Sequence, residues 1–291
     1  MKRLTIFTPT YNRAYILPKL YDSLCEQTCQ DFEWLIVDDG STDHTKELVE
    51  GWKLEKIVDI RYLYQDNSGK MMAHNRAVRE SKTELFMCVD SDDHLCSAQV
   101  VGDVISFWVN YNKNLSDDIC GIIAFKEIGQ KRMAFPEGMN VAHLSEMGDK
   151  GFKGEAALIF RRDVLEQYPF PSFVGEKFVT DVYIYDQIDQ KYMFMLFSYY
   201  VQHCEYHEDG YSHNYMKLLF KNPKGFRAYH NQCVSLRKKG YLKSIICYVA
   251  LSLRIGDWGM MRYASSKILT ILLFPLGILK YLYDNYRLSH I

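Results

Sequence analysis

Three carboxylates follow directly after an apolar run near residue 90. The run "ELFMCV" ends at Val89, and Asp90, Ser91, Asp92 and Asp93 come next. Like charges this close repel one another, so a fold keeps them together when a cation neutralises them. Hard divalent cations such as Mg²⁺ and Mn²⁺ prefer oxygen ligands and share them with substrate phosphates. The Asp-x-Asp pattern therefore favours a metal–diphosphate site, with an ordinary polar turn as the alternative.

A second acidic pair follows another apolar run. Asp38 and Asp39 come after "EWLIV", and Gly40 permits a tight turn behind them. A carboxylate placed here can accept a hydrogen bond from a nucleobase N–H or a ribose hydroxyl. Asp43, a few residues later, is instead predicted to cap a helix that runs to about residue 52.

Two further segments carry groups suited to a nucleotide. In "TPTYNR", Pro9 is expected to end the strand's ladder, Tyr11 offers a ring for stacking and Arg13 a fork for phosphate. In "DNSGKMMAHN", Lys70 stands at a predicted helix start, which suits an anion. His74 lies on the same face of that helix, four residues on.

The elements that must position these groups alternate regularly along the first hundred residues. Short apolar, β-prone runs predict strands at 4–9, 32–37, 60–64 and 84–89. Helical spacing predicts helices between and after them, at 14–29, 43–52, 69–81 and 97–111. Such alternation predicts an α/β fold, a mostly parallel sheet flanked by helices. Ligands of these sheets bind outside the carboxyl ends of the strands, where both acidic clusters fall.

The rest of the chain is less regular. Further strands are predicted at 119–125, 156–160 and 193–201, with helices near 162–168 and 182–190. Residues 127–153 show no period and are interpreted as a long loop. From residue 216 the pattern is helical and basic, which predicts a helical C-terminal appendage.

The charge distribution points to an anionic surface. The net charge is −1, yet residues 211–291 hold 13 Lys or Arg and two acidic residues, Asp257 and Asp284. The run "ILTILLFPLGIL" at 268–279 is expected to be too short to span a bilayer, because Pro275 breaks it. Flanked by Lys267 and Lys280, it favours peripheral contact with a membrane surface, with packing on the domain as the alternative.

The cysteines suggest a reducing compartment. Eight are scattered along the chain without a Cys-x-x-Cys pair, and Cys88 and Cys247 lie inside apolar runs. The strand-like "RLTIFTP" begins at once, so no secretory leader is expected. Buried thiols in a cytoplasmic protein are the resulting prediction.

The motifs "TPTYNR", "EWLIVDDGS", "NSGKMMAHNRA" and "FMCVDSDD", in this order and spacing, resemble the family-2 glycosyltransferases with the GT-A fold. The likeness continues through "AALIFRRDVLEQYPFP", "GEKFVTD" and "NPKGF", which are similar to bacterial cell-surface polysaccharide members. The resemblance implies a catalytic domain over 1–215, with a nucleotide-binding half at 1–95 and an acceptor half at 96–215. A basic amphipathic helical tail then occupies 216–291.

The resemblance also implies an enzyme that transfers a sugar, with inversion, from a nucleotide-sugar that is commonly a UDP-sugar. The acceptor would be a saccharide or a lipid-linked saccharide, with Mn²⁺ or Mg²⁺ as cofactor, at the inner face of the membrane. Residues carried over as nucleotide-sugar ligands are Thr8, Pro9, Tyr11, Arg13, Asp39, Lys70 and Asp90. Asp92 is the expected direct metal ligand, with Asp90, Asp93 and a late histidine, His207, as further candidates.

An inverting transfer needs a carboxylate base on the acceptor side, because the acceptor hydroxyl must lose a proton. "GEKFVTD" supplies Glu176 and Asp181, and the resemblance favours Asp181, at the start of a helix. A helix cap is the structural alternative for Asp181. The spacing His203-x3-His207 also matches a zinc site on a helix, but the preceding "FSYYV" is typical of a strand.

Other functions fit less well. A dinucleotide dehydrogenase needs a Gly-rich turn after the first strand, and a Walker loop needs a glycine five residues before Gly69. Nucleic acid is not an expected partner, because the basic residues of the tail are interleaved with long apolar runs. A catalytically silent sugar-nucleotide-binding homologue remains the alternative. The sequence assigns no donor sugar, linkage or oligomeric state.

Overall fold

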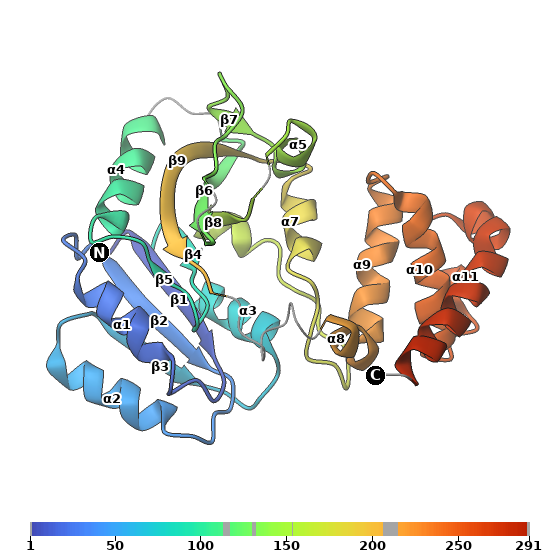
Figure 1. The fold of residues 1–291 in the computed structure, drawn as a ribbon, viewed down its shortest axis with the longest axis horizontal. Coiled ribbons are helices and arrows are strands. Elements are labelled where there is room, and N and C mark those ends of the chain that lie inside the picture. The colour runs from blue at the N-terminus through green and yellow to red at the C-terminus, as the bar shows by residue number, and fades with distance from the viewer. Residues whose placement is uncertain (1, 113–116, 130–131, 153, 206–214, 290–291) are drawn as a thin grey trace. The chain divides into compact units, whose positions relative to one another are not determined.

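The computed structural model describes residues 2–112, 117–129, 132–152, 154–205 and 215–289 (Figure 1). The chain forms two compact units, each of which is described by itself. The first contains residues 1–170 and 184–207. The second contains residues 171–183 and the described part of 208–291.

The first unit is built on one mixed sheet. Its strands follow the order β3-β2-β1-β4-β8-β6-β9-β5, and β7 pairs with β9. The strands are β1 (Leu4–Thr10), β2 (Phe32–Asp38), β3 (Ile60–Tyr64), β4 (Leu85–Cys88), β5 (His94–Leu95), β6 (Ile119–Glu127), β7 (Val141–Ala142), β8 (Ala156–Arg161) and β9 (Met193–His203). The first four correspond to the four strands predicted from apolar runs, and the α/β fold is confirmed.

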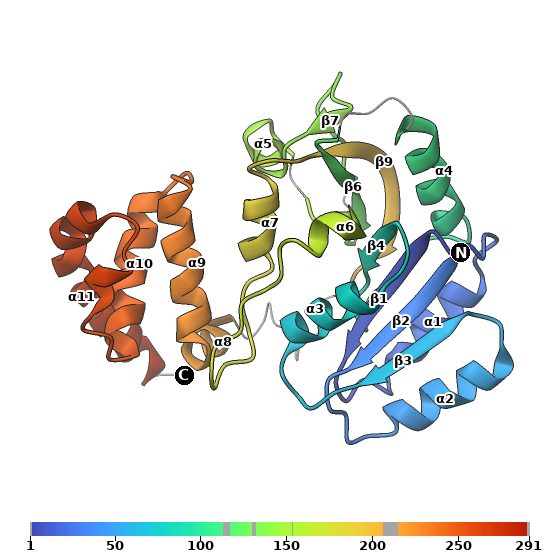
Figure 2. The ribbon, with the colours of Figure 1, turned by 180° about the vertical axis from the view of Figure 1, so that it is seen from behind.

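Helices cover both faces of this sheet because successive side chains of each strand point to opposite sides. Ile6 of β1 belongs to one core cluster with residues of α1 (Leu17–Cys25), α2 (Thr45–Glu55) and α4 (Val100–Asn112). Phe7, its neighbour, faces α3 (Lys70–Glu80), where its ring lies 5.7 Å from that of His74. Accordingly, α1 lies in front of the sheet in Figure 1 and α3 lies in front of it in Figure 2.

The strand order places a topological switch point between β1 and β4. The chain steps outward from β1 to β2 and β3, and then returns through α3 to the other side of β1. All three pairings in this part are parallel, so the carboxyl ends of the four strands share one edge. A crevice outside this edge, at the point where the order reverses, is where such sheets bind ligands.

The later strands depart from the parallel pattern. β8 is antiparallel to both β4 and β6, whereas β6 and β9 are parallel. Residues 127–153, predicted to be a loop, contain β7 and the short helix α5 (Leu144–Asp149). Asp189 accepts hydrogen bonds from the first N–H groups of α5, those of Leu144 and Ser145. This long-range cap explains a helix too short to leave a period in the sequence.

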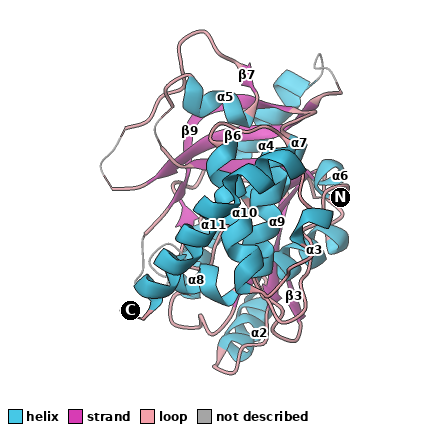
Figure 3. Cartoon of the chain, turned by 90° about the vertical axis from the view of Figure 1, so that its right-hand side faces the viewer, coloured by secondary structure: helices cyan, strands magenta, loops and turns pink. Residues whose placement is uncertain are grey.

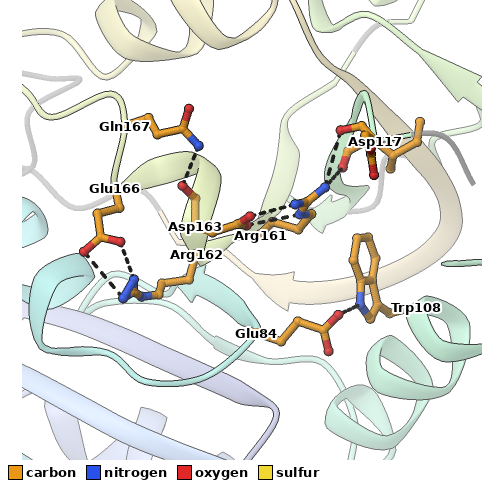
Figure 4. A network of polar contacts seen from close by, with 9 residues as sticks. Glu84, Trp108, Asp117, Arg161, Arg162, Asp163, Glu166 and Gln167 are labelled. Carbon is orange, nitrogen blue, oxygen red and sulfur yellow. Dashed lines mark hydrogen bonds and ion pairs between the residues drawn. The ribbon is translucent and has the colours of Figure 1, made fainter.

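A hydrogen bond fastens the amino-terminal end of β4, and an ion pair fastens the end of β8 (Figure 4). Trp108 donates its indole N–H to Glu84 at 2.7 Å, which ties α4 to the start of β4. Arg161 pairs with Asp163 and also donates to the backbone carbonyl of Ile119 at 3.1 Å. These contacts connect α6 (Arg162–Leu165) with the neighbouring strands. The polar groups at this edge of the sheet are therefore used by the structure itself.

The second unit is helical, as predicted for the C-terminal part. It contains α8 (Tyr215–Lys221), α9 (Pro223–Ser235), α10 (Tyr241–Arg254) and α11 (Lys267–Leu288), and Figure 3 shows the last three side by side. The helix α7 (Val182–Ile188) returns the chain to the first unit.

The expectation that Pro275 breaks the apolar run was wrong. α11 is 22 residues long and continues through Pro275. The proline lies on the exposed side of the helix, where the carbonyl that loses its donor can meet solvent.

Candidate functional site

The loop after β1 is fixed by an asparagine and presents an aromatic ring. Asn12 adopts φ 54°, a left-handed conformation that asparagine tolerates better than most residues. Its side-chain oxygen accepts the N–H of Thr42 at 2.8 Å, which joins the loops after β1 and β2. Tyr11 is 49% exposed, and Arg13 donates to the hydroxyl of Tyr15 at 2.7 Å. Tyr11 and Arg13 therefore stand at the expected strand edge.

Thr8 and Pro9 are buried inside the sheet. The hydroxyl of Thr8 accepts the indole N–H of Trp34 at 2.9 Å, so that side chain is occupied by the core. Pro9 does not end the ladder with β2, which continues through the pair Thr10–Asp38. It lies beyond the last β4 pair, Phe7–Cys88, where its missing N–H costs no β4 hydrogen bond.

Both carboxylates of the first acidic cluster are satisfied by the protein. Asp38 accepts the N–H of Ser41 at 2.7 Å and the hydroxyl of Tyr62 at 2.6 Å. Asp39 accepts the side-chain amide of Gln65 and the N–H of Ser68, both at 2.8 Å. It also accepts the N–H of Gly69 at 2.7 Å. Asp39 thus holds the segment that leads into α3, and any ligand contact must share these oxygens.

Asp43 was predicted to be the N-cap of α2, but it lies one position before the cap. Its oxygens accept the N–H of Thr45 and, at 3.1 Å, the N–H of Ala14, while His44 occupies the N-cap position of α2. Burial raises its pKa, but the hydrogen bonds from Thr45 and Ala14 outweigh that effect and hold the pKa below its usual value. Asp43 is a structural anchor of the helix start.

Asp90, in the second cluster, forms an ion pair with Lys70. The ammonium of Lys70, the first residue of α3, lies 2.6 and 2.7 Å from the two oxygens of Asp90. This bond crosses from α3 to the end of β4, beside the switch point. Burial raises the pKa of Asp90, but Lys70 and Lys126 outweigh burial and hold it below its usual range.

Asp93 has a second lysine, which sequence reasoning missed. Lys126, near the end of β6, lies 3.5 Å from Asp93, and the thiol of Cys204 lies 3.1 Å from the same carboxylate oxygen. Asp93 is only 6% exposed, and burial raises its pKa to about 6 although Lys126 opposes the shift. The signal in the sequence was one lysine after the apolar run "ICGIIAF".

Asp92 differs from its two neighbours. Within the part of the chain that the structure describes, its carboxylate has no hydrogen bond or ion pair, and its side chain is partly exposed. The described residues contain no group of three His, Cys, Asp or Glu arranged to hold a metal by themselves. A cation at Asp92 would therefore need oxygens from a ligand, and a diphosphate supplies such oxygens.

Glu176 and the start of α9 clamp one another within the second unit. The two carboxylate oxygens of Glu176 accept the N–H groups of Lys224 and Gly225, each at 2.8 Å. In return, the side-chain oxygen of Asn222 accepts the N–H groups of Lys177 and Phe178, at 2.9 and 3.1 Å. The motifs "GEKFVTD" and "NPKGF" thus meet as one structural feature.

Gly225 is required by this clamp. A Cβ at this position would lie 2.5 Å from the carbonyl oxygen of Phe178, so a side chain would force the two segments apart. The rings of Phe178 and Phe226 stack beside it, with centroids 5.6 Å apart.

Asp181 belongs to the same segment but is free of such a role. It is exposed, immediately before α7, and accepts the N–H of Val182 at 2.9 Å through one oxygen. Its other oxygen has no hydrogen bond or ion pair among the described residues. His207, the remaining predicted metal ligand, lies outside the described residues.

The first part of this chain matches a known family. The profile of the family described as "Glycosyl transferase family 2" matches residues 5–168, more than half of the chain. A teichoic acid poly(glycerol phosphate) polymerase of Staphylococcus epidermidis is 35% identical over 126 residues, which are 43% of this chain and 17% of the relative. The poly(ribitol-phosphate) β-N-acetylglucosaminyltransferase TarS of Staphylococcus aureus is 29% identical over 109 residues. That match covers 37% of this chain and 19% of TarS, so the chain spans about a fifth of these relatives.

Solved structures show the same fold over nearly the whole chain. The crystal structure of S. aureus TarS 1–349 in complex with UDP has a TM-score of 0.60 at 15% identity, covering 99% of this chain and 92% of that one. The mannosyltransferase PcManGT of Pyrobaculum calidifontis, in complex with GDP-Man and Mn²⁺, has a TM-score of 0.56 at 17% identity. It covers 97% of this chain and 87% of that chain. These likenesses show the fold, and the family match over more than half of the chain shows that the chain belongs to glycosyl transferase family 2.

Proposed function

We propose that this protein transfers a sugar from a nucleoside-diphosphate sugar, with UDP-sugar as the expected donor, to a saccharide or lipid-linked saccharide. Cell-surface polysaccharide synthesis is the proposed setting, because one relative named above is a teichoic acid polymerase and another is a poly(ribitol-phosphate) glycosyltransferase. The observation that carries the proposal is the edge at the switch point. There, Asp92 has no partner among the described residues and lies between carboxylates that Lys70 and Lys126 already neutralise.

The residues at this edge suit the parts of a nucleotide-sugar. Tyr11 offers an exposed ring for the base, and Arg13 and Lys70 offer positive charge for the phosphates. Mn²⁺ or Mg²⁺ fits the donor set of Asp92 with Asp90, since these ions commonly take one or two carboxylates plus substrate phosphates. When bound, such an ion would offset the charge of the departing diphosphate.

For the base of an inverting single displacement, the proposal is Asp181 rather than Glu176. A base must have an oxygen free to receive the acceptor proton. Both oxygens of Glu176 hold the start of α9, whereas Asp181 is exposed and uses one oxygen for a neighbouring N–H. Glu176 is then a positioning residue for the segment that carries Asp181.

A membrane setting completes the proposal. The basic balance of residues 211–291 favours the anionic inner face of the cytoplasmic membrane, where a lipid-linked saccharide would be met.

A donor panel followed by mutants tests the function. Thermal shift with nucleotide-sugars, with and without Mn²⁺, should identify a donor, because a bound ligand stabilises the folded state by mass action. Transfer by wild-type protein should then give a product of inverted anomeric configuration, measured by NMR. Asp181→Asn should abolish transfer while leaving the donor-induced thermal shift. Equal turnover in Asp181→Asn and wild type would rule out this base, and binding of UDP with no turnover of any donor would favour the silent alternative.

A further inference from the structure

The helix α11 has small or polar residues at its three buried positions and large apolar residues on its exposed side. Its buried residues, Thr270, Gly277 and Asp284, recur every seven positions and face α10. The residues on the opposite side of α11 are exposed. Viewed along the helix axis, they point within about 60° of the direction opposite to Gly277. We call this side the outer face of α11, formed by Ile268, Ile271, Leu272, Leu279, Leu282 and Tyr286.

Polar and close contacts fix the inner side of α11 to α10. A Cβ at Gly277 would lie 2.3 Å from a methyl group of Val249, so glycine permits the close approach of the two helices. Arg254 of α10 donates to the side chain of Asn285 at 2.7 Å. Lys280 pairs with the buried Asp284 at 2.6 Å. The charged groups of the middle of α11 are therefore held on the packed side.

Exposed residues of two kinds occur at the ends of α11 and in the connection that precedes it. Lys267 and Arg287 stand exposed near the two ends of α11, within a segment that holds 13 basic and two acidic residues. Trp258 and Tyr263, in the connection between α10 and α11, are 79% and 59% exposed. Tryptophan and tyrosine prefer the boundary between lipid and water, and basic residues are attracted to anionic headgroups.

We infer that α11 lies in the plane of an anionic membrane surface, with its outer face in the lipid, and does not cross the bilayer. Among the described residues, α11 is the helix whose length and composition would allow a crossing. Its 22 residues are about 33 Å long, against about 30 Å of hydrocarbon. A crossing would, however, take Lys280 and Asp284 into the hydrocarbon and strip α10 from the helix, which an in-plane position avoids.

Vesicle binding by the full chain tests this inference. At low salt, the protein should sediment with vesicles of phosphatidylcholine and phosphatidylglycerol, but much less with phosphatidylcholine alone. Leu272→Glu and Leu279→Glu should each weaken binding by about tenfold, because each removes an apolar side chain from lipid and adds repulsion. Leu54→Glu is the matched control: Leu54 is 82% exposed on α2, and its replacement should leave binding unchanged.

The orientation has its own readout. Carbonate at high pH should release an in-plane helix from the vesicles, and protein that resists carbonate would overturn the inference in favour of a crossing helix. Wild-type protein that stays in the supernatant with anionic vesicles would also overturn it. So would sedimentation velocity showing a dimer that Leu272→Glu converts to monomer, because the outer face would then bind a second copy.

The inference does not depend on glycosyl transfer. Sugar transfer to a soluble acceptor, measured on the same variants, should persist in Leu272→Glu and Leu279→Glu. Loss of vesicle binding with turnover retained separates the surface from the active site.

Discussion

Two acidic clusters end neighbouring regions of the same sheet, yet the protein treats them differently. Asp38 and Asp39 are buried and accept hydrogen bonds from backbone N–H groups and neutral side chains. Asp90 and Asp93 are instead paired with lysines, and Asp92 between them has no partner in the part of the chain that the structure describes. The first cluster organises loops, whereas the second concentrates charge of both signs at an accessible edge.

The second unit repeats the contrast with single residues. Glu176 spends both oxygens on the start of α9, and Asp181, five residues later, stays exposed. A carboxylate whose lone pairs are occupied contributes to stability, while one that is accessible and unengaged can serve chemistry. Substitution by the isosteric amide should separate the two classes.

Among variants of the two acidic clusters, the largest effect is expected for Asp92→Asn. Loss of this carboxylate should lower kcat/KM by about two orders of magnitude, because the charge of the leaving diphosphate is no longer offset. The melting temperature should not change, since Asp92 has no partner among the described residues. Asp22→Asn, on the exposed side of α1, is the control for removing a surface charge. If Asp92→Asn lowered the melting temperature as much as Asp39→Asn does, the two clusters would not differ in their structural role.

Asp39→Asn should show the opposite profile. The amide nitrogen cannot accept the hydrogen bonds that Asp39 receives from Ser68 and Gly69, so one buried N–H loses its acceptor. We expect the free energy of unfolding to fall by about 2 kcal/mol, measured by urea denaturation. Unchanged stability together with lost UDP binding would instead assign Asp39 to the ligand alone.

The helix α3 connects the two clusters, and its buried histidine should make folding stability sensitive to acid. His74 of α3 is buried among the rings of Phe7, Phe86 and Phe170, and burial lowers its pKa to about 3. Unfolding restores a pKa near 6.5, so the unfolded chain binds more protons between these values. The contribution of His74 to stability should therefore be complete above pH 6.5 and fall by about 1.4 kcal/mol per pH unit below it. His74→Phe should flatten this slope in urea melts at pH 6.5 and pH 5, whatever its absolute stability.

The smallest effect is the change in folding stability expected for variants of Glu176 and Asp181. Glu176→Gln should lower the free energy of unfolding by about 1 kcal/mol, because one of two helix-start N–H groups loses its acceptor. Asp181→Asn, which alters an exposed residue, should change it by less than about 0.5 kcal/mol. Differential scanning fluorimetry on both variants is sufficient. A reversed order would assign the structural role to Asp181.

The architecture of the first hundred residues was predictable because its signals are local. The strands β1 to β4 are apolar runs ended by polar residues, and α1 to α4 follow the helical period, so both were read correctly within a few residues. The placing of Asp90, Asp92 and Lys70 near one edge followed from the parallel order of those strands.

What the sequence hid depends on contacts between distant residues. Lys126 reaches Asp93 only because β6 returns to the middle of the sheet beside β8, an antiparallel arrangement that no local pattern encodes. The short helix α5 relies on Asp189, more than forty residues away. Asp43 lies one position before the cap of α2, and it also binds Ala14 of another loop, a contact that the sequence does not indicate.

The clamp between Glu176 and α9 sets a limit on dissecting this protein. A chain that ends at residue 215, the boundary suggested by the change in composition, would keep Asp181 but lose Asn222, Lys224 and Gly225. The segment 171–183 would then lack the partners that fix its backbone. The basic helices are consequently part of the scaffold that supports Asp181. Removing them should impair both the proposed sugar transfer and the proposed membrane binding.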